Sequence, residues 1–209
     1  MTFEFVDPPH DCNKCPRLTD FRTANRKAHP DWFNGPVPAF GPIDCKLLVV
    51  GLAPGLQGAN RTGRPFTGDH AGDLLYPTLI KFGWAKGVYG QSIDDGLSLN
   101  GCRITNAVRC VPPQNKPVGA EQKACRSFLV DELNNLPELT TLLALGRIAH
   151  EAVLTTLGFK KSAYAFAHAA HHDLGDGLTL VDSYHCSRYN LNTRRLTPKM
   201  FEDVFRSIS

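Results

Sequence analysis

The stretch that decides the fold is Gly51-Leu-Ala-Pro-Gly-Leu-Gln-Gly-Ala-Asn-Arg-Thr-Gly-Arg-Pro-Phe-Thr-Gly-Asp69, with the apolar run Leu47-Leu-Val-Val50 directly before it. A short apolar run of this kind is typical of a buried strand. The five glycines and two prolines that follow predict a long loop without helix or strand. Such loops are uncommon in compact domains unless they are functional. We therefore expect this loop to line a site, and a plain surface connector is the alternative.

The rest of the chain repeats the pattern of apolar run, loop and amphipathic segment. Predicted strands cover 102–106, 139–145 and 178–184, with a weaker candidate within 163–174. Predicted helices cover 71–82, 118–134, 147–157 and the segment after Thr197-Pro198. In the third helix we expect Ile148, Ala152 and Leu157 to face inward. Strands that alternate with helices indicate an α/β fold with a parallel sheet covered on both faces.

Length and composition predict one domain over residues 1–209. Residues 1–45 are rich in proline and polar groups, so we expect an irregular N-terminal arm there. No apolar run approaches the roughly 20 residues that cross a bilayer, and the N-terminus lacks the pattern of a signal peptide. We therefore expect a soluble cytoplasmic protein with no membrane partner. The net charge is only +3, yet residues 186–199 hold four basic side chains and no acidic one, so a local basic patch is expected.

Three loops begin where a predicted strand ends, over 51–69, 106–117 and 185–196. Because parallel strands end at one edge of the sheet, the starts of these loops share a cleft. We expect Asp69, Asn106 and His185 to be neighbours there.

The seven cysteines indicate a metal site or free thiols in a reducing compartment. Cys12 and Cys15 have the spacing of two ligands on one metal or cluster, and Cys110 and Cys125 are the best candidates for two more. Zinc and an iron-sulfur cluster both remain open from the residues alone. Either would pin the N-terminal arm to the domain. Ordinary burial or a free thiol is expected for the remaining three: Cys45, Cys102 and Cys186.

The loop 51–69, the segment Thr105-Asn-Ala-Val-Arg-Cys110, and Ser183-Tyr-His185 with the following Asn192-Thr-Arg-Arg-Leu-Thr197 together closely resemble the type-b, or family 5, uracil-DNA glycosylases. The resemblance spans nearly the whole chain, in order. It implies a three-layer α/β/α sandwich around a four-stranded parallel sheet, DNA as the partner of a monomeric enzyme, and hydrolytic excision of uracil that leaves an abasic site. Hypoxanthine is a further base to test.

The resemblance also implies a 4Fe-4S cluster held by Cys12, Cys15, Cys110 and Cys125. This chain departs from the family at two positions, since relatives usually have alanine at Gly55 and proline at Cys186. Neither departure removes a catalytic group.

Excising a base requires that it leave the stack and enter a pocket. Phe66 is predicted to stack on the flipped base, Asn106 to bind the pyrimidine edge, and the backbone of Gly51, Leu52 and Ala53 to hold the ring. His185 is predicted to donate a hydrogen bond to the pyrimidine O2 as negative charge develops. The alternatives are an aromatic in the core, a turn asparagine and a structural histidine.

Asp69 has two interpretations. As a catalytic group it orients a water or balances the developing charge of the sugar, and as a structural group it caps the helix that begins near Ala71. We predict the catalytic role and leave the cap open.

Phosphate contacts are predicted for arginines of the first and last loops, with Tyr189 or Leu191 pressing into the gap left by the flipped nucleotide. The arginines are Arg61, Arg64, Arg188, Arg194 and Arg195. Two other classes compete with this prediction: a cluster-bearing nucleic-acid-binding module without catalysis, and a nucleotide-binding protein that uses the loop 51–69 as a phosphate cradle. The second is disfavoured because no Gly-Lys-Ser or Gly-Lys-Thr ends that loop.

Overall fold

The computed structural model describes residues 7–208, so residues 1–6 of the predicted arm and Ser209 lie outside the described residues. The central sheet has five strands in the order β4-β1-β5-β7-β6. Four are parallel: β1 (Leu47–Gly51), β4 (Cys102–Asn106), β5 (Thr141–Leu145) and β7 (Thr179–Ser183). The predicted four-stranded parallel sheet is confirmed. The weaker candidate contributes β6 (His171–Asp173), which pairs antiparallel with β7 at the edge.

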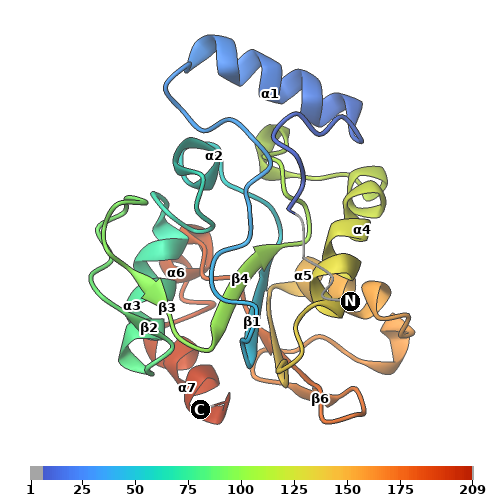
Figure 1. Ribbon diagram of the computed structural model, residues 1–209. Coiled ribbons are helices and arrows are strands. Elements are labelled where there is room, and N and C mark those ends of the chain that lie inside the picture. The colour runs from blue at the N-terminus through green and yellow to red at the C-terminus, as the bar shows by residue number, and fades with distance from the viewer. Residues whose placement is uncertain (1–6, 209) are drawn as a thin grey trace.

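Helices cover both faces of the sheet, which confirms the three-layer fold (Figure 1). One face is covered by α3 (His70–Lys81) and α7 (Pro198–Ile208), and the other by α5 (Arg147–Thr156) with α4 (Gly119–Asn134) beside it. Successive strand residues point to opposite faces. Accordingly Val49 and Leu143 belong to the core under α3 and α7, whereas Leu48 and Leu142 belong to the core under α5.

The N-terminal arm contains α1 (Pro16–Ala28), so the prediction of irregular structure over 1–45 is wrong. This helix lies apart from the two helical layers, at the top of Figure 1. Leu18 is its only buried apolar residue, so apolar spacing gave no signal for it. Polar contacts hold it instead, such as the ion pair of Arg17 Nε with Glu121 Oε1 at 2.7 Å.

Short elements also occur where loops were predicted. The loop 51–69 contains α2 (Ala59–Thr62), and 185–196 contains α6 (Arg188–Asn192). Residues 83–101 hold a hairpin of β2 (Ala85–Lys86) and β3 (Ser98–Leu99). Two single 3₁₀ turns also occur: η1 (Pro113–Asn115) and η2 (Lys161–Ala163). Elements of two to five residues are too short to show apolar periodicity.

The inward face of α5 differs from its prediction. Ile148 is 41% exposed, and the buried positions include Ala149, Val153 and His150. Only apolar residues were expected to face inward. His150 is buried as well, and its ring hydrogen-bonds Asp182 and the carbonyl of Tyr164. A polar residue inside the core is tolerated when its hydrogen bonds are made.

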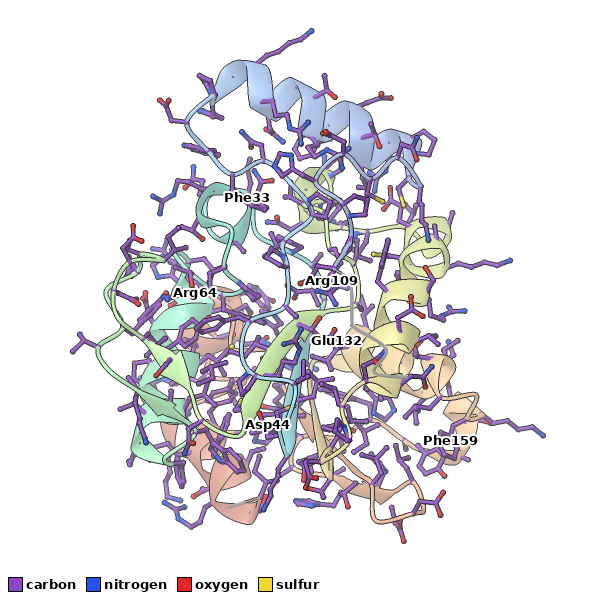
Figure 2. All side chains as sticks on the ribbon, in the orientation of Figure 1. Phe33, Asp44, Arg64, Arg109, Glu132 and Phe159 are labelled. Carbon is purple, nitrogen blue, oxygen red and sulfur yellow. The ribbon has the colours of Figure 1, made fainter. Side chains whose placement is uncertain are left out.

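A buried charge cluster fixes the end of β4. Glu132, on α4, is fully buried and accepts from Arg103 Nε at 2.7 Å, from Thr105 Oγ1 at 2.7 Å and from Arg109. Arg109 and Glu132 meet beside β4 in Figure 2. Removing one member of such a group leaves an unpaired buried charge, at about 3–5 kcal/mol. The strand end that carries Asn106 is therefore rigid.

Candidate active site

A cavity of about 580 Å³ opens at the edge of the sheet where β1, β4 and β7 end. Asp69, Asn106 and His185 all line it, as the strand-end argument predicted for these three residues. They come from three different loops. Parallel topology therefore brings together side chains that are more than 100 positions apart in the chain.

Gly51 sits where Asn106 and Phe66 come closest to the backbone. A Cβ at position 51 would lie 2.6 Å from Cζ of Phe66 and closer still to Oδ1 of Asn106. Real Cβ atoms do not approach that closely. Glycine at this position therefore allows the amide and the ring to lie side by side at the cavity wall.

The backbone around Phe66 is held in an unusual conformation. Phe66 has φ of +53°, in the left-handed region that non-glycine residues seldom adopt. Its carbonyl accepts from Tyr89 Oη at 3.1 Å, and the preceding Pro65 carbonyl accepts from Tyr76 Oη. The Phe66 ring belongs to the core cluster and also lines the cavity, with its centroid 6.1 Å from that of His185. The ring is thus fixed in place before any ligand arrives.

Asn106 and His185 have no hydrogen bond from their side chains to any residue within 7–208. Asn106 is only 2% exposed, so its amide faces little besides the cavity. Burial lowers the pKa of His185 to about 4, and its imidazole is therefore neutral at neutral pH. A neutral imidazole can still donate one hydrogen bond.

The two carboxylate oxygens of Asp69 have different surroundings. Its Oδ1 accepts from the backbone N–H of Ala71 at 3.0 Å and of Gly72 at 3.1 Å, so it is the N-cap of α3. Its Oδ2 faces two glycines, because a Cβ at Gly55 would lie 3.3 Å from it and one at Gly58 2.6 Å. Burial raises the pKa of the Asp69 carboxyl above its usual range.

The surroundings of Asp69 show what glycine at position 55 changes. An alanine methyl group there would stand in tight contact with Oδ2 of Asp69, on the side of the carboxylate that the cap leaves free. Glycine at position 55 therefore keeps that side of Asp69 accessible from the cavity, which both residues line.

The predicted arginines divide into two groups. Arg64 is buried and binds Asp95 in a bidentate ion pair, at 2.9 and 2.6 Å, so the prediction that it contacts phosphate is wrong. It fixes the loop through Asp95 and through Thr67 Oγ1. The other four predicted arginines have exposed side chains: Arg61, Arg188, Arg194 and Arg195.

Of the two residues predicted to enter the DNA, Tyr189 is 72% exposed on α6. Leu191 instead packs against the core. Arg188, next to Tyr189, lines the cavity. Tyr189 is therefore an exposed aromatic residue that directly follows a cavity-lining residue in the chain.

Four polar residues of the cavity wall were not among the predicted site residues. They are Gln57, His70, Asn115 and Ser187. All but His70 lie in the three loops that follow strands, and that position was the signal available for them. Their side-chain types carry no further indication of a role.

The four cysteines Cys12, Cys15, Cys110 and Cys125 line a second, small cavity between α1 and α4. Arg22 of α1 reaches across it, donating to the Cys12 carbonyl at 2.8 Å and lying 3.6 Å from the Cys110 sulfur. Within the described residues, no three of these sulfurs lie within 4.8 Å of one another. A single zinc ion, with Zn–S bonds of about 2.3 Å, would draw its ligands closer together than that.

The four thiols have the chemistry of ligands for a metal centre. Burial raises the pKa of Cys110 to about 12, and the thiols of Cys125 and Cys12 add to the effect. A cationic centre relieves such crowding, because it binds the sulfurs as thiolates. Four converging thiols are also the ligand set that iron-sulfur clusters use.

The other three cysteines are fully buried, as expected. Cys45 lies in the core under α5, and Cys102 and Cys186 in the core under α3 and α7. Cys186 lies near Asp69, whose charge adds to burial in raising the pKa of the thiol.

Comparison with known proteins gives consistent matches. Residues 38–209 match the family described as the uracil DNA glycosylase superfamily. The chain is 47% identical over 206 residues to a type-5 uracil-DNA glycosylase of Thermus thermophilus, covering 96% of this chain and 93% of that protein. It is 41% identical over 203 residues to one of Mycobacterium leprae, covering 93% and 89%. For one of Pyrobaculum aerophilum the values are 36% over 207 residues, covering 97% and 90%.

Proposed function

The chain belongs to the uracil DNA glycosylase superfamily, and we propose that its cavity holds a flipped uracil for excision by Asp69, Asn106 and His185. The protein is a uracil-DNA glycosylase of DNA repair, which hydrolyses the N-glycosidic bond. One observation carries the assignment of the site: the Phe66 ring and two polar side chains, which have no hydrogen-bond partner within residues 7–208, line one cavity. Burying polar groups without partners costs about 1–3 kcal/mol each, so these two are arranged for a ligand.

The base binds by its face and its edge. Phe66 stacks on the face of the pyrimidine, and the Asn106 amide hydrogen-bonds its polar edge. The backbone of Leu52 and Ala53 at the cavity wall holds the ring from the other side, and Gly51 admits the close approach. The ordered positions of these groups reduce the cost of organising the site around the base.

In the chemical step the bond between C1′ and the base nitrogen breaks, and its electron pair leaves with the base. The His185 imidazole donates to O2 of the departing base, where negative charge develops. Oδ2 of Asp69 orients a water toward C1′ and accepts its proton when the water oxygen bonds to that carbon. Gly58 leaves space beside Oδ2, because a Cβ there would lie 2.6 Å from it.

DNA is contacted around the cavity mouth by the exposed arginines, with Arg188 nearest the flipped nucleotide. Tyr189 presses into the gap that the nucleotide leaves in the stack. Phosphate contacts make binding weaken with salt. The protein acts on DNA as a monomer, with single and double strands both accessible to this open site.

A 4Fe-4S cluster is the cofactor that best fits Cys12, Cys15, Cys110 and Cys125. It would supply structural support, tying α1 and the arm 1–45 to α4 within a single domain 1–209. Two observations support this role: the four cysteines line one cavity, and Leu18 is the one apolar residue that α1 buries. Cytoplasmic localisation accords with a cluster held by reduced thiols. None of the helices within residues 7–208 is long and apolar enough to cross a bilayer.

The deciding experiment uses oligonucleotides bearing uracil, hypoxanthine or xanthine, followed by alkaline cleavage at abasic sites. We expect strong cleavage with uracil. Cleavage with hypoxanthine is also expected, because a cavity of about 580 Å³ has room for a purine. A non-catalytic binding module would bind these oligonucleotides and cleave none. Unmodified oligonucleotides of the same sequence are the control.

The acid–base state of the site gives a prediction for pH. Because the pKa of His185 is lowered to about 4, its ring is neutral on both sides of the ordinary histidine value near 6.5. The single-turnover excision rate should therefore not fall as pH rises from 5.5 to 8. On the acid side it should fall as Asp69 is protonated, at a pH above the ordinary aspartate value because burial raises that pKa. An alkaline decline centred near pH 6.5 would show that His185 acts as a cation instead.

A further inference from the structure

The position of His185 depends on its backbone, because its imidazole has no protein hydrogen bond within residues 7–208. The carbonyl of His185 accepts from Nδ2 of Asn190 at 2.8 Å. On the other side, the backbone N–H of Tyr184 donates to Nδ1 of His168 at 3.2 Å. His168 thus holds the N–H of the Ser183–Tyr184 peptide, one residue before the peptide that joins Tyr184 to His185. The carbonyl of that next peptide accepts from Ser183 Oγ at 2.9 Å.

His168 is itself held from two sides. Its ring stacks on the ring of Tyr184, with centroids 5.0 Å apart and planes 17° from parallel. The backbone of Met200, in α7, also lies near the ring and raises its pKa, against the larger effect of burial. Nδ1 can accept from Tyr184 only if it carries no proton, and burial lowers the pKa of His168, which favours that neutral ring. The residue therefore links α7 to the end of β7.

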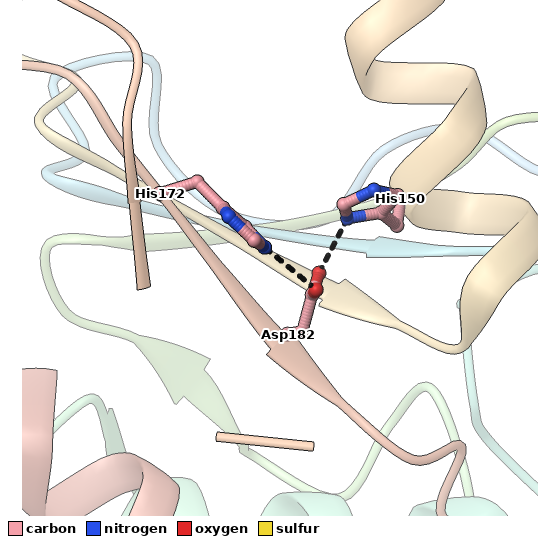
Figure 3. Close-up of side chains that lie close together, drawn as sticks. All are labelled: His150, His172 and Asp182. Atoms are coloured by element: carbon pink, nitrogen blue, oxygen red, sulfur yellow. Dashed lines mark hydrogen bonds and ion pairs between the residues drawn. The ribbon is translucent and has the colours of Figure 1, made fainter. Parts of the chain in front are cut away.

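The segment that carries His168 is anchored by Asp182, on β7. The backbone N–H of Ala169 donates to the Asp182 carbonyl at 2.8 Å, and that of Ala167 to its carboxylate at 3.3 Å. The carboxylate is fully buried between His150, at 2.7 Å, and His172, at 3.0 Å, as Figure 3 shows. Both separations are hydrogen-bond lengths. This group of three, which has the residue types of a metal site, is thus accounted for as a hydrogen-bonded anchor.

We propose that His168 is a positioning residue for His185, fixing the Tyr184 peptide so that the imidazole of His185 faces the base in the cavity. The proposal rests on the role of His185 given under Proposed function. No other side chain in the described part of the chain accepts from the Tyr184 N–H. Losing this acceptor would leave the Ser183–Tyr184 peptide held only through its carbonyl, which accepts from the Gly146 N–H at 2.8 Å. Ser183 Oγ and Asn190 would still hold the carbonyls of Tyr184 and His185.

The expected effect is on the chemical step. A catalytic group displaced by about 1 Å can cost on the order of 10²-fold in rate. Binding of DNA should change little, because Arg61 and Arg188 lie outside the contacts of His168. Arg195 is the arginine to watch, since its Cζ lies 4.7 Å from the centroid of the Tyr184 ring on which His168 stacks. A general loss of stability would instead lower activity in every background alike.

The test is a double-mutant cycle on the full-length protein. His168→Ala and His168→Asn are made with His185 intact and in His185→Ala, because the amide of asparagine can place an acceptor near the position of Nδ1. The matched control is His171→Ala, since His171 is exposed and bonds only Ser207 through its ring. The single-turnover excision rate, the Kd for a uracil oligonucleotide and the melting temperature are measured for each.

We expect His168→Ala to lower the excision rate about ten- to a hundredfold while the Kd changes by no more than about twofold. His168→Asn should recover most of the lost rate. Neither substitution should lower the rate further when His185 is already alanine. The same rate loss in both backgrounds, or a folded His168→Asn as slow as His168→Ala, would overturn the proposal. If His168→Ala does not fold, His168→Gln takes its place, because the longer side chain puts its amide at the level of Nε2. Full activity of His185→Ala would overturn the role of His185 as well, whereas full activity of His168→Ala overturns this inference alone.

Discussion

Replacing Asp69 with asparagine is expected to lower the single-turnover rate of uracil excision by about 10²- to 10⁴-fold while the melting temperature stays near that of the wild type. Asparagine keeps an oxygen where Oδ1 caps α3 through the N–H groups of Ala71 and Gly72. It loses the carboxylate at Oδ2, which faces Gly55 and Gly58 at the cavity. The substitution therefore separates the catalytic role of Asp69 from its structural one.

The matched variant is Asp69→Ala, which removes both. It should be as slow as Asp69→Asn and also less stable by about 1 kcal/mol, the usual cost of a lost N-cap. Thermal melting and the excision rate are measured side by side on both variants. A wild-type rate in Asp69→Asn would leave Asp69 as a helix cap only, and the water would need another partner.

Replacing Cys12 with alanine should abolish the broad visible absorbance of the purified protein and lower its melting temperature on the order of 10 °C, because the free energy of binding a metal group is also folding free energy. The effect should be concentrated on α1. This helix buries only Leu18 among its apolar residues and meets the domain through polar contacts and the cysteine cavity. Trypsin should then cut within residues 16–28, at sites such as Arg22, which is buried in the intact protein.

The control for loss of a thiol is Cys45→Ala, because Cys45 is fully buried in the core under α5 and away from the cysteine cavity. It should keep the absorbance and resist trypsin as the wild type does. Iron and acid-labile sulfide are measured in each preparation. A protein that binds zinc and no iron, or a Cys12→Ala variant with unchanged absorbance, would contradict the cluster assignment.

The parallel strands were predictable because their signal is local. Runs such as Leu47 to Val50 are apolar throughout, as strands buried on both faces must be. The strand ends alone place Asn106 and His185 at one edge of the sheet, because parallel strands end there. Asp69 was predicted to join them, although it lies at the far end of the loop 51–69, and it does line the same cavity. Gly51 was predicted to permit close approach, and the structure shows Asn106 and Phe66 as the groups that approach it.

Other features could not be predicted because they depend on partners distant in the chain. Arg64 looked like a phosphate contact until Asp95, 31 residues further on, was found to bind it. The burial of His150 on α5 needs Asp182, on β7. Of the residues predicted to face inward, Leu157 packs against the core and Ile148 is exposed. In both cases a charged or polar side chain is buried because tertiary contacts satisfy it.

The sequence by itself therefore determined the layered architecture, the edge where the site lies and the residue types that line it, because strand burial and parallel order follow from local composition. Only the tertiary structure decided which polar groups bond to other protein groups and which face the cavity. Arg64 belongs to the first kind, Asn106 and His185 belong to the second, and Asp69 serves both. The physical reason is that a hydrogen bond or ion pair is fixed by geometry in space, and sequence spacing does not contain that geometry.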